Sequence, residues 1–250
     1  MLRRIRIFES AFLCRAGSGK DWMFVVFAVF LFGEEMRGVL EMVSILPEKS
    51  YICNRKGMSM KKLYIIAGCN GAGKTTASYT VLPEMLDCHE FVNADEIARG
   101  LSPFNPKSMS IDAGRLMLIR IKTLLNDGAD FAFETTLATK YYVNLVRQAQ
   151  EKGYYVTLVY FWLRSPEMAV ERVRTRVEAG GHGVGEPEIR RRYAKGIKNL
   201  FDLYMPVCDY WIIFDSSNLQ IDMVAKGAKD ETKTIVNPLI YKTIKEYERG

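Results

Sequence analysis

The spacing of apolar residues along the chain predicts strands that alternate with helices. Continuous apolar runs, typical of strands buried on both faces, occur at 63–67, 131–133, 154–163 and 209–214, and a shorter strand is expected within 90–98. Helices are expected over 75–85, 108–126, 139–152 and 234–248, and two more begin at 165 and 187. Residues 219–234 are polar and poorly patterned. This alternation predicts an α/β fold, with a mainly parallel five-stranded sheet between two layers of helices.

Residues 1–59 do not follow this alternation. They contain an apolar run of 12 residues, 22–33, whereas a helix that spans a membrane needs about 20. Charged residues follow the run at Glu34, Glu35 and Arg37, where a signal peptide would have the small residues of a cleavage site. We therefore expect no stable membrane insertion.

Three interpretations of this first segment remain open. In one, the natural start of the protein is Met58 or Met60, just before the first strand of the sheet. In the others, the segment is a weak membrane anchor or signal, or an accessory helix that packs on the rest. The expected organisation is an N-terminal extension, 1–59, followed by one nucleotide-binding domain, 60–250.

The charge and the cysteines narrow the classes of function. The net charge of +6, from 35 basic and 29 acidic residues, suits an anionic substrate such as a nucleotide, but no long run of Lys or Arg indicates a nucleic acid. None of the five cysteines forms a C-x-x-C pair and there are two histidines, which disfavours a zinc site and a disulfide framework. Reduced thiols are typical of a cytoplasmic protein.

A glycine-rich motif after the first strand carries the clearest chemistry. It fills the pattern G-x-x-x-x-G-K-[ST], with an apolar strand before it and a helix after it. Its glycines let backbone N–H groups turn toward a phosphate, and the N-terminal end of the next helix faces the same anion. The motif predicts an ATP-binding P-loop, in a P-loop NTPase/kinase-like fold. The candidate ATP-binding residues are Gly68, Asn70, Gly71, Ala72, Gly73, Lys74, Thr75 and Thr76.

Two of these side chains have specific roles in the hypothesis. Lys74 supplies a mobile positive charge to the β- and γ-phosphates, and the Thr75 hydroxyl is suited to coordinate Mg²⁺. Without ATP, we expect Lys74 to be exposed in the empty cradle, so that Lys74→Ala leaves the fold intact.

Asp95 follows the short strand within 90–98. Ligands of open parallel sheets bind outside the carboxyl ends of the strands, so Asp95 is placed to reach a substrate hydroxyl. The alternative is an N-cap of the next helix, a position that Asp also favours. One residue can serve both roles.

Glu134, Thr135 and Thr136 come at the carboxyl end of the strand 131–133. A carboxylate and two hydroxyls at this place suit a polar substrate or a water molecule bound to Mg²⁺. An N-cap for the helix over 139–152 is an alternative for Thr135 or Thr136, but it explains Glu134 less well.

Two helices with several arginines are joined by a glycine-rich loop at 180–185. The first carries Arg176, and the second carries Arg190 and Arg191. Arginines around a mobile hinge are typical of a lid that contacts phosphate groups. A solvated charged face is the alternative interpretation.

Taken together, these motifs resemble the zeta-toxin-like P-loop kinases, and their chromosomal branch in particular. The resemblance covers about residues 61–218, and the motifs come in the same order. They are AGCNGAGKTT, FVNADEIARGL, FAFETTL, RVRTRVEAGGHGV with RRRY, and DSSN.

The resemblance implies an activity. Plasmid zeta toxins phosphorylate a sugar hydroxyl of UDP-N-acetylglucosamine, so the expected reaction is transfer of the ATP γ-phosphoryl group to an alcohol. Kinases of another small alcohol, such as an antibiotic or a nucleoside, and a non-catalytic ATP-binding switch are the alternatives. An antitoxin protein is a candidate partner.

The resemblance also implies roles for single residues. Asp95 would be the general base, while Glu134 and Thr136 would hold the substrate. Lys74 would act in catalysis as well as in ATP binding. Among the arginines, Arg176 and Arg191 would stabilise the transferring phosphoryl group and Arg190 would contact ATP.

Overall fold

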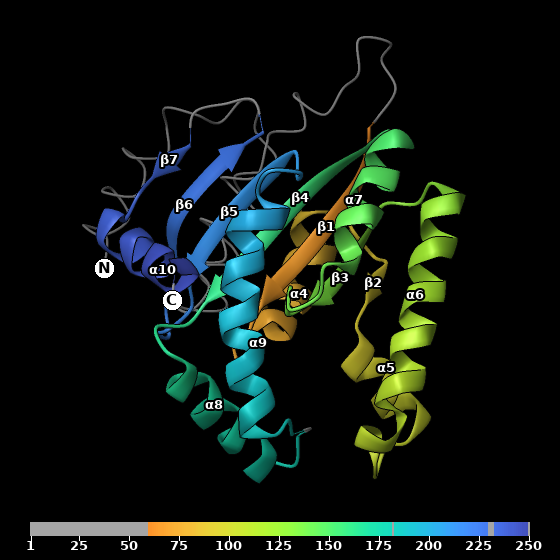
Figure 1. Ribbon diagram of the computed structural model, residues 1–250. Helices are drawn as coiled ribbons and strands as arrows, with labels where there is room; N and C mark the ends of the chain where they lie inside the picture. Colours follow the sequence, from red (N-terminus) through yellow and green to blue (C-terminus); the bar gives the residue numbers. More distant parts are fainter. Residues whose placement is uncertain (1–59, 182, 230–232, 250) are drawn as a thin grey trace, which may run out of the picture.

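The structure is a computed structural model that describes residues 60–181, 183–229 and 233–249. The interpretations of residues 1–59 therefore lie outside the described residues. Within the described residues, no helix combines the length and the apolar character needed to cross a bilayer. The elements, as labelled in Figure 1, are β1 (Lys61–Gly68), α4 (Lys74–Met85), β2 (Phe91–Val92), α5 (Ala94–Leu101), η3 (Pro106–Met109), α6 (Ser110–Asp127), β3 (Phe131–Thr135), α7 (Tyr141–Glu151), β4 (Tyr154–Trp162), α8 (Pro166–Glu178), α9 (Glu186–Asn199), η4 (Leu200–Tyr204), β5 (Tyr210–Asp215), β6 (Asp222–Ala228), β7 (Thr234–Ile235) and α10 (Pro238–Arg249).

These strands form one sheet in the order β2-β3-β1-β4-β5-β6-β7. The strands from β2 to β5 pair in parallel, as expected for an α/β fold, whereas β6 and β7 pair antiparallel. In Figure 1, α4 lies behind the sheet and α7 and α9 lie in front of it. The α/β fold with a mainly parallel sheet is therefore confirmed.

The expected number of five strands is wrong, because the described residues form seven. The strand that the sequence analysis missed most clearly is β6, within the segment 219–234. This strand pairs with β5 and the short β7, near one edge of the sheet, and its sequence includes Lys226 and Gly227. It therefore lacks the continuous apolar run that is typical of a strand buried on both faces. Tertiary pairing with β5 decides its conformation.

The ends of two helices also differ from the expectation. The turn η3 precedes α6, so that helix begins at Ser110 instead of Ser108. Thr234 and Ile235 pair with β6, and the closing helix begins at Pro238, a residue that favours the first turn of a helix. These differences lie away from the P-loop.

The register of the central strands positions the site. β1 pairs with both β3 and β4, and its residue Ile66 lies opposite Glu134 of β3. Because the strands are parallel, their carboxyl ends meet at one edge of the sheet. Glu134 therefore stands beside the end of β1, where the P-loop begins.

Candidate active site

The P-loop connects β1 to α4 with the expected geometry. Gly73 is the N-cap of α4 and has a φ of 77°, a left-handed conformation that a residue with a side chain adopts only with strain. No side chain caps this helix, so its first N–H groups are directed to the loop. At the other end of the loop, a Cβ on Gly68 would lie 2.3 Å from the carbonyl oxygen of Phe161. The loop therefore requires glycine at both of these positions, and its role as a cradle for an anion stays a prediction.

Other segments hold this loop from two sides. The Ser216 hydroxyl, just after β5, donates a hydrogen bond to the Ala72 carbonyl at 3.0 Å. On the other side, a Cβ on Gly71 would lie 3.0 Å from the carbonyl oxygen of Ala169 in α8. The DSSN run and α8 thus fix the P-loop.

Glu134 lies at the centre of a small group of polar side chains, which we call the Glu134 cluster: Lys74, Thr75, Asn93 and Glu134. The Lys74 ammonium lies 3.4 Å from Glu134 Oε1 and donates a hydrogen bond to the Cys69 carbonyl at 2.9 Å. Thr75 Oγ1 donates to Glu134 Oε2 at 2.6 Å, and Asn93 Nδ2 donates to the same oxygen at 2.8 Å. Three elements, α4, β3 and the end of β2, therefore meet at one carboxylate.

This arrangement corrects the expectation that Lys74 is exposed. Lys74 is only 5% exposed, and both of its contacts are with groups of opposite or partial negative charge. A buried ammonium needs such partners, since desolvation disfavours an unpaired charge.

Asn93 is a further candidate for a functional residue, and the sequence analysis did not identify it. Its side chain caps α5, because Asn93 Oδ1 accepts hydrogen bonds from the N–H groups of Asp95 and Glu96. The amide nitrogen of the same side chain reaches Glu134. An Asn directly after a strand and before two acidic residues is a typical helix N-cap, and this signal could have identified it.

The cap therefore belongs to Asn93, and the N-cap interpretation of Asp95 is wrong. Asp95 lies half-buried in the first turn of α5, two residues after Asn93. Asp95 therefore lies near the Glu134 cluster, and its role as a general base stays a prediction.

The two threonines after Glu134 have different surroundings. Thr135 is buried, and its hydroxyl accepts a hydrogen bond from the Leu137 N–H at 3.1 Å. Thr136 is half-buried and stays a substrate-binding candidate. Neither caps α7, because that helix has Lys140 at its N-cap and the Thr139 hydroxyl accepts from the Tyr141 N–H.

The oxygen donors of the Glu134 cluster fit Mg²⁺. This ion prefers oxygen ligands, keeps several water molecules, and usually takes one or two protein side chains beside the phosphates of its nucleotide. The Thr75 hydroxyl and the Glu134 carboxylate, 2.6 Å apart, offer such a pair. Among the described residues no group of three or more His, Cys, Asp or Glu side chains could hold a metal by itself.

The arginines of α8 and α9 fall into two groups. Arg192 Nη1 approaches Asn70 Oδ1 of the P-loop at 3.5 Å, and Arg172 donates a hydrogen bond to the Ser217 carbonyl at 2.9 Å. In contrast, Arg190 pairs with Glu167 and Glu186, and Arg191 pairs with Glu188. We call these ion pairs, together with the one between Arg192 and Glu188, the arginine cluster.

The arginines that contact the P-loop or its supports, Arg172 and Arg192, are thus not among the three that the sequence analysis selected. Arg190 and Arg191 engage glutamates on the solvent side, and Arg176 lies half-buried on α8 beside Gly181. Arg172 and Arg192 belong to the same two helices and are added to the candidates because they contact the P-loop or its supports.

The P-loop also contains a buried thiol, that of Cys69. Burial raises the pKa of Cys69 to about 11, although the neighbouring Lys74 ammonium favours the thiolate. At neutral pH this thiol stays protonated, and its backbone carbonyl, which accepts from Lys74, is the part that serves the site.

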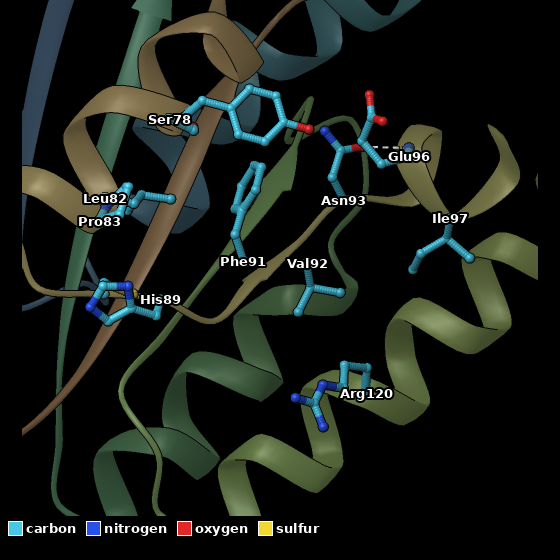
Figure 2. A pocket seen from close by; sticks show the side chains of 12 residues that line it. Ser78, Leu82, Pro83, His89, Phe91, Val92, Asn93, Glu96, Ile97 and Arg120 are labelled. Atoms are coloured by element: carbon cyan, nitrogen blue, oxygen red, sulfur yellow. Dashed lines mark hydrogen bonds between the residues drawn. The ribbon is translucent and has the colours of Figure 1, made fainter. Parts of the chain in front are cut away.

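A hollow of about 530 Å³ opens beside Asn93, between α4, β2, α5 and α6. Figure 2 shows Asn93 and Glu96 toward one end of it and His89 and Arg120 toward the other, with Phe91 and Val92 between them. It shares Asn93 with the Glu134 cluster, so the hollow reaches the carboxyl end of β2.

Comparisons with known sequences show which family of proteins this chain resembles. The family model of the zeta toxin matches residues 49–198, which is more than half of the chain. An uncharacterised protein of Haemophilus influenzae is 30% identical over 144 residues, which are 54% of this chain and 100% of that protein.

Comparisons with solved structures concern the fold. The crystal structure of AvrRxo1-ORF1:AvrRxo1-ORF2 with sulphate ions has a TM-score of 0.61 at 16% identity, over 92% of this chain and 78% of that chain. The PezAT chromosomal toxin–antitoxin system of Streptococcus pneumoniae has a TM-score of 0.54, also at 16% identity, over 86% and 88% of the two chains. A further structure of AvrRxo1-ORF1 with ORF2 contains ATP and has a TM-score of 0.55.

Proposed function

Because the chain belongs to the zeta toxin family of P-loop kinases, we propose that it transfers the γ-phosphoryl group of ATP to a hydroxyl of a small molecule. The observation that carries this proposal is the Glu134 cluster. A carboxylate that contacts both the lysine and the threonine of a P-loop suits phosphoryl transfer with a divalent cation.

ATP would bind with its phosphates in the P-loop cradle, at the N-terminal end of α4. The N–H groups after Gly73 and the Lys74 ammonium would hold the phosphate oxygens. Thr75 and Glu134 would hold Mg²⁺, which neutralises charge that develops on the phosphate groups. Lys74 would exchange Glu134 and the Cys69 carbonyl for phosphate oxygens when ATP binds.

Asp95 would accept the proton of the acceptor hydroxyl as the new bond to phosphorus forms. Asn93 supports this role, because its side chain caps the turn that carries Asp95 and also contacts Glu134. Arg192, beside Asn70, would approach the transferred group, and Thr136 would contact the acceptor.

The acceptor that the family suggests is a sugar nucleotide such as UDP-N-acetylglucosamine, and the hollow beside Asn93 has the size to accommodate part of it. The toxin–antitoxin system among the similar structures supports an antitoxin as partner. Residues 60–250 would act as the kinase domain, in the cytoplasm where ATP is available.

The test is a single-turnover assay of Asp95→Asn with UDP-N-acetylglucosamine and other alcohols. The substitution keeps the size of the side chain but removes its charge, so ATP affinity should change little. Turnover should fall by about 10²–10⁴-fold, which is the usual contribution of a positioned general base.

Asp112→Asn is the matched control, because it makes the same chemical change in the first turn of another helix, α6, where Asp112 pairs with Arg115 in solvent. Its turnover should stay near wild type. Near-normal turnover of Asp95→Asn would remove Asp95 from catalysis. ATP binding without phosphoryl transfer to any alcohol would favour the ATP-binding switch instead of the kinase.

A further inference from the structure

The segment after Glu134 makes an unusual turn in the interior. Leu137 is fully buried and has a φ of 55°, a left-handed conformation that is rare for a residue other than glycine. Its N–H donates to the Thr135 hydroxyl, so the turn is partly held by its own side chains. Such a conformation persists only where the surrounding structure enforces it.

The enforcing contacts come from the end of α9 and from η4. Asn199 Nδ2 donates a hydrogen bond to the Leu137 carbonyl at 2.6 Å, and Asn199 is only 4% exposed. The Tyr204 hydroxyl donates to the Thr139 carbonyl, also at 2.6 Å. Two backbone carbonyls of the turn therefore depend on side chains more than sixty residues away in the sequence.

Close packing adds a third restraint at Thr136. A Cβ on Gly196 would lie 2.6 Å from the Thr136 carbonyl oxygen. Since real Cβ atoms do not come so close to an oxygen, only glycine lets α9 approach the turn to this distance. Gly196 and Asn199, three residues apart, face the same side of the helix.

We propose that Asn199 is a positioning residue that fixes Glu134 and Thr136 through the buried turn at Leu137. Asn199 contacts neither of these side chains, so it acts by holding the backbone that carries them. This inference rests on the proposed function, which gives Glu134 the metal and Thr136 the acceptor.

The physical reason lies in the Leu137 carbonyl. A buried carbonyl that loses its donor is unsatisfied, and the turn relaxes to find another partner. Glu134 and Thr136 would then shift relative to the P-loop. A displacement of about 1 Å in a group that positions reactants can lower the rate by about 10²-fold.

The experiment uses Asn199→Leu, which keeps the approximate volume and removes the amide. Two readouts are measured on the full-length chain: kcat for phosphoryl transfer, and the Mg²⁺ concentration needed for half-maximal ATP binding by calorimetry. We expect kcat to fall by about 10- to 100-fold and the Mg²⁺ requirement to rise several-fold, and we expect KM for the acceptor to rise because Thr136 shifts with the turn.

Gln150→Leu is the matched control. Gln150 lies at the end of α7, and its amide also donates to a backbone carbonyl of a distant segment, that of Val207, at 2.8 Å. This contact lies away from the P-loop, at the opposite end of the sheet from Glu134. Gln150→Leu should lower the melting temperature and leave kcat and the Mg²⁺ requirement unchanged.

Two further variants keep the test decisive if Asn199→Leu does not fold. Asn199→Ser retains a short polar side chain, and Gly196→Ala pushes against the Thr136 carbonyl without touching the amide. Both should show the same fall in kcat and the same rise in Mg²⁺ requirement.

The outcomes separate this inference from the proposed function. If wild type transfers phosphate and the folded variants at 196 and 199 behave like the Gln150 control, the positioning role is wrong. If wild type binds ATP but phosphorylates nothing, the kinase proposal fails, and a raised Mg²⁺ requirement in the variants still supports the positioning of Glu134. If neither Asn199 nor Gly196 variants change that requirement, the inference fails in this case too.

Discussion

The Glu134 cluster and the arginine cluster lie at the same edge of the sheet, and both pair acidic with basic side chains. They differ in exposure. Lys74 and Glu134 have side chains that are 6% and 13% exposed, whereas Arg190 and Glu167 are 41% and 65% exposed. The first pair is shielded from water, and the second is largely solvated.

This difference decides what each cluster contributes. Exposed ion pairs are screened and contribute about 0–1 kcal/mol each, so they exchange partners at little cost. Buried pairs are expensive to break by removing one partner. Without ATP, the Glu134 cluster is therefore a fixed part of the site, whereas the ion pairs of the arginine cluster change partners at little cost.

The largest effect is expected from Lys74→Ala. Removal of the ammonium should lower phosphoryl transfer by at least about 10²-fold, since an electrostatic donor in a phosphate site is worth this much. Because Lys74 is buried and paired with Glu134, the variant should also lose about 1–3 kcal/mol of unfolding free energy without ligand. Denaturant unfolding and single-turnover kinetics check both. An unchanged free energy of unfolding would show that the pair is not a fixed element.

A smaller and more selective effect is expected within the arginine cluster. Arg192→Ala removes the one arginine of α9 that approaches the P-loop among the described contacts, and it should lower kcat by about 10- to 100-fold. Arg191→Ala is its neighbour and control, with an expected change of less than about threefold, because its ion pair with Glu188 is solvated. Equal losses in both variants would contradict the division of the arginines into two groups.

The smallest effect concerns pH. The guanidinium of Arg191 foremost, together with that of Arg192, lowers the pKa of Glu188 to about 2 from an ordinary value of 4.5. The stabilisation is therefore fully present above pH 4.5 and is lost as the pH falls through about 2. As Glu188 is about one-third exposed, the contribution should stay below about 1 kcal/mol.

The measurement is the difference in melting temperature between wild type and Glu188→Gln at pH 6 and again at pH 3. The difference should shrink at the lower pH. A difference that stays constant would mean that charge on Glu188 does not contribute to stability.

The sequence by itself determined those parts of the protein whose conformation depends on residues close together in the chain. A strand, a glycine-rich loop and a helix follow one another without interruption, and each dihedral angle and N–H group of the loop lies within the motif from Gly68 to Thr75. The placement of Asp95 and Glu134 at strand ends was also predictable, because the carboxyl ends of parallel strands meet at one edge.

Only the tertiary structure decided which distant groups meet. Asn93, Thr75 and Glu134 come from three separate segments, and their common contact at one carboxylate depends on the order of β2, β3 and β1. The burial of Lys74 follows from this contact, so it could not be read from the motif. In the same way, residues 222–228 form the strand β6 because they pair with β5.

The arginines show the physical reason most plainly. Successive residues of an α-helix point about 100° apart, so Arg190, Arg191 and Arg192 cannot all face the P-loop. The buried residues of α9, Ile189, Tyr193 and Ile197, set the rotation of the helix against the core, and this rotation turns Arg192 toward Asn70. The run RRRY shows that an arginine is available to contact the P-loop. The packing of α9 against the core determines which of the three arginines makes this contact.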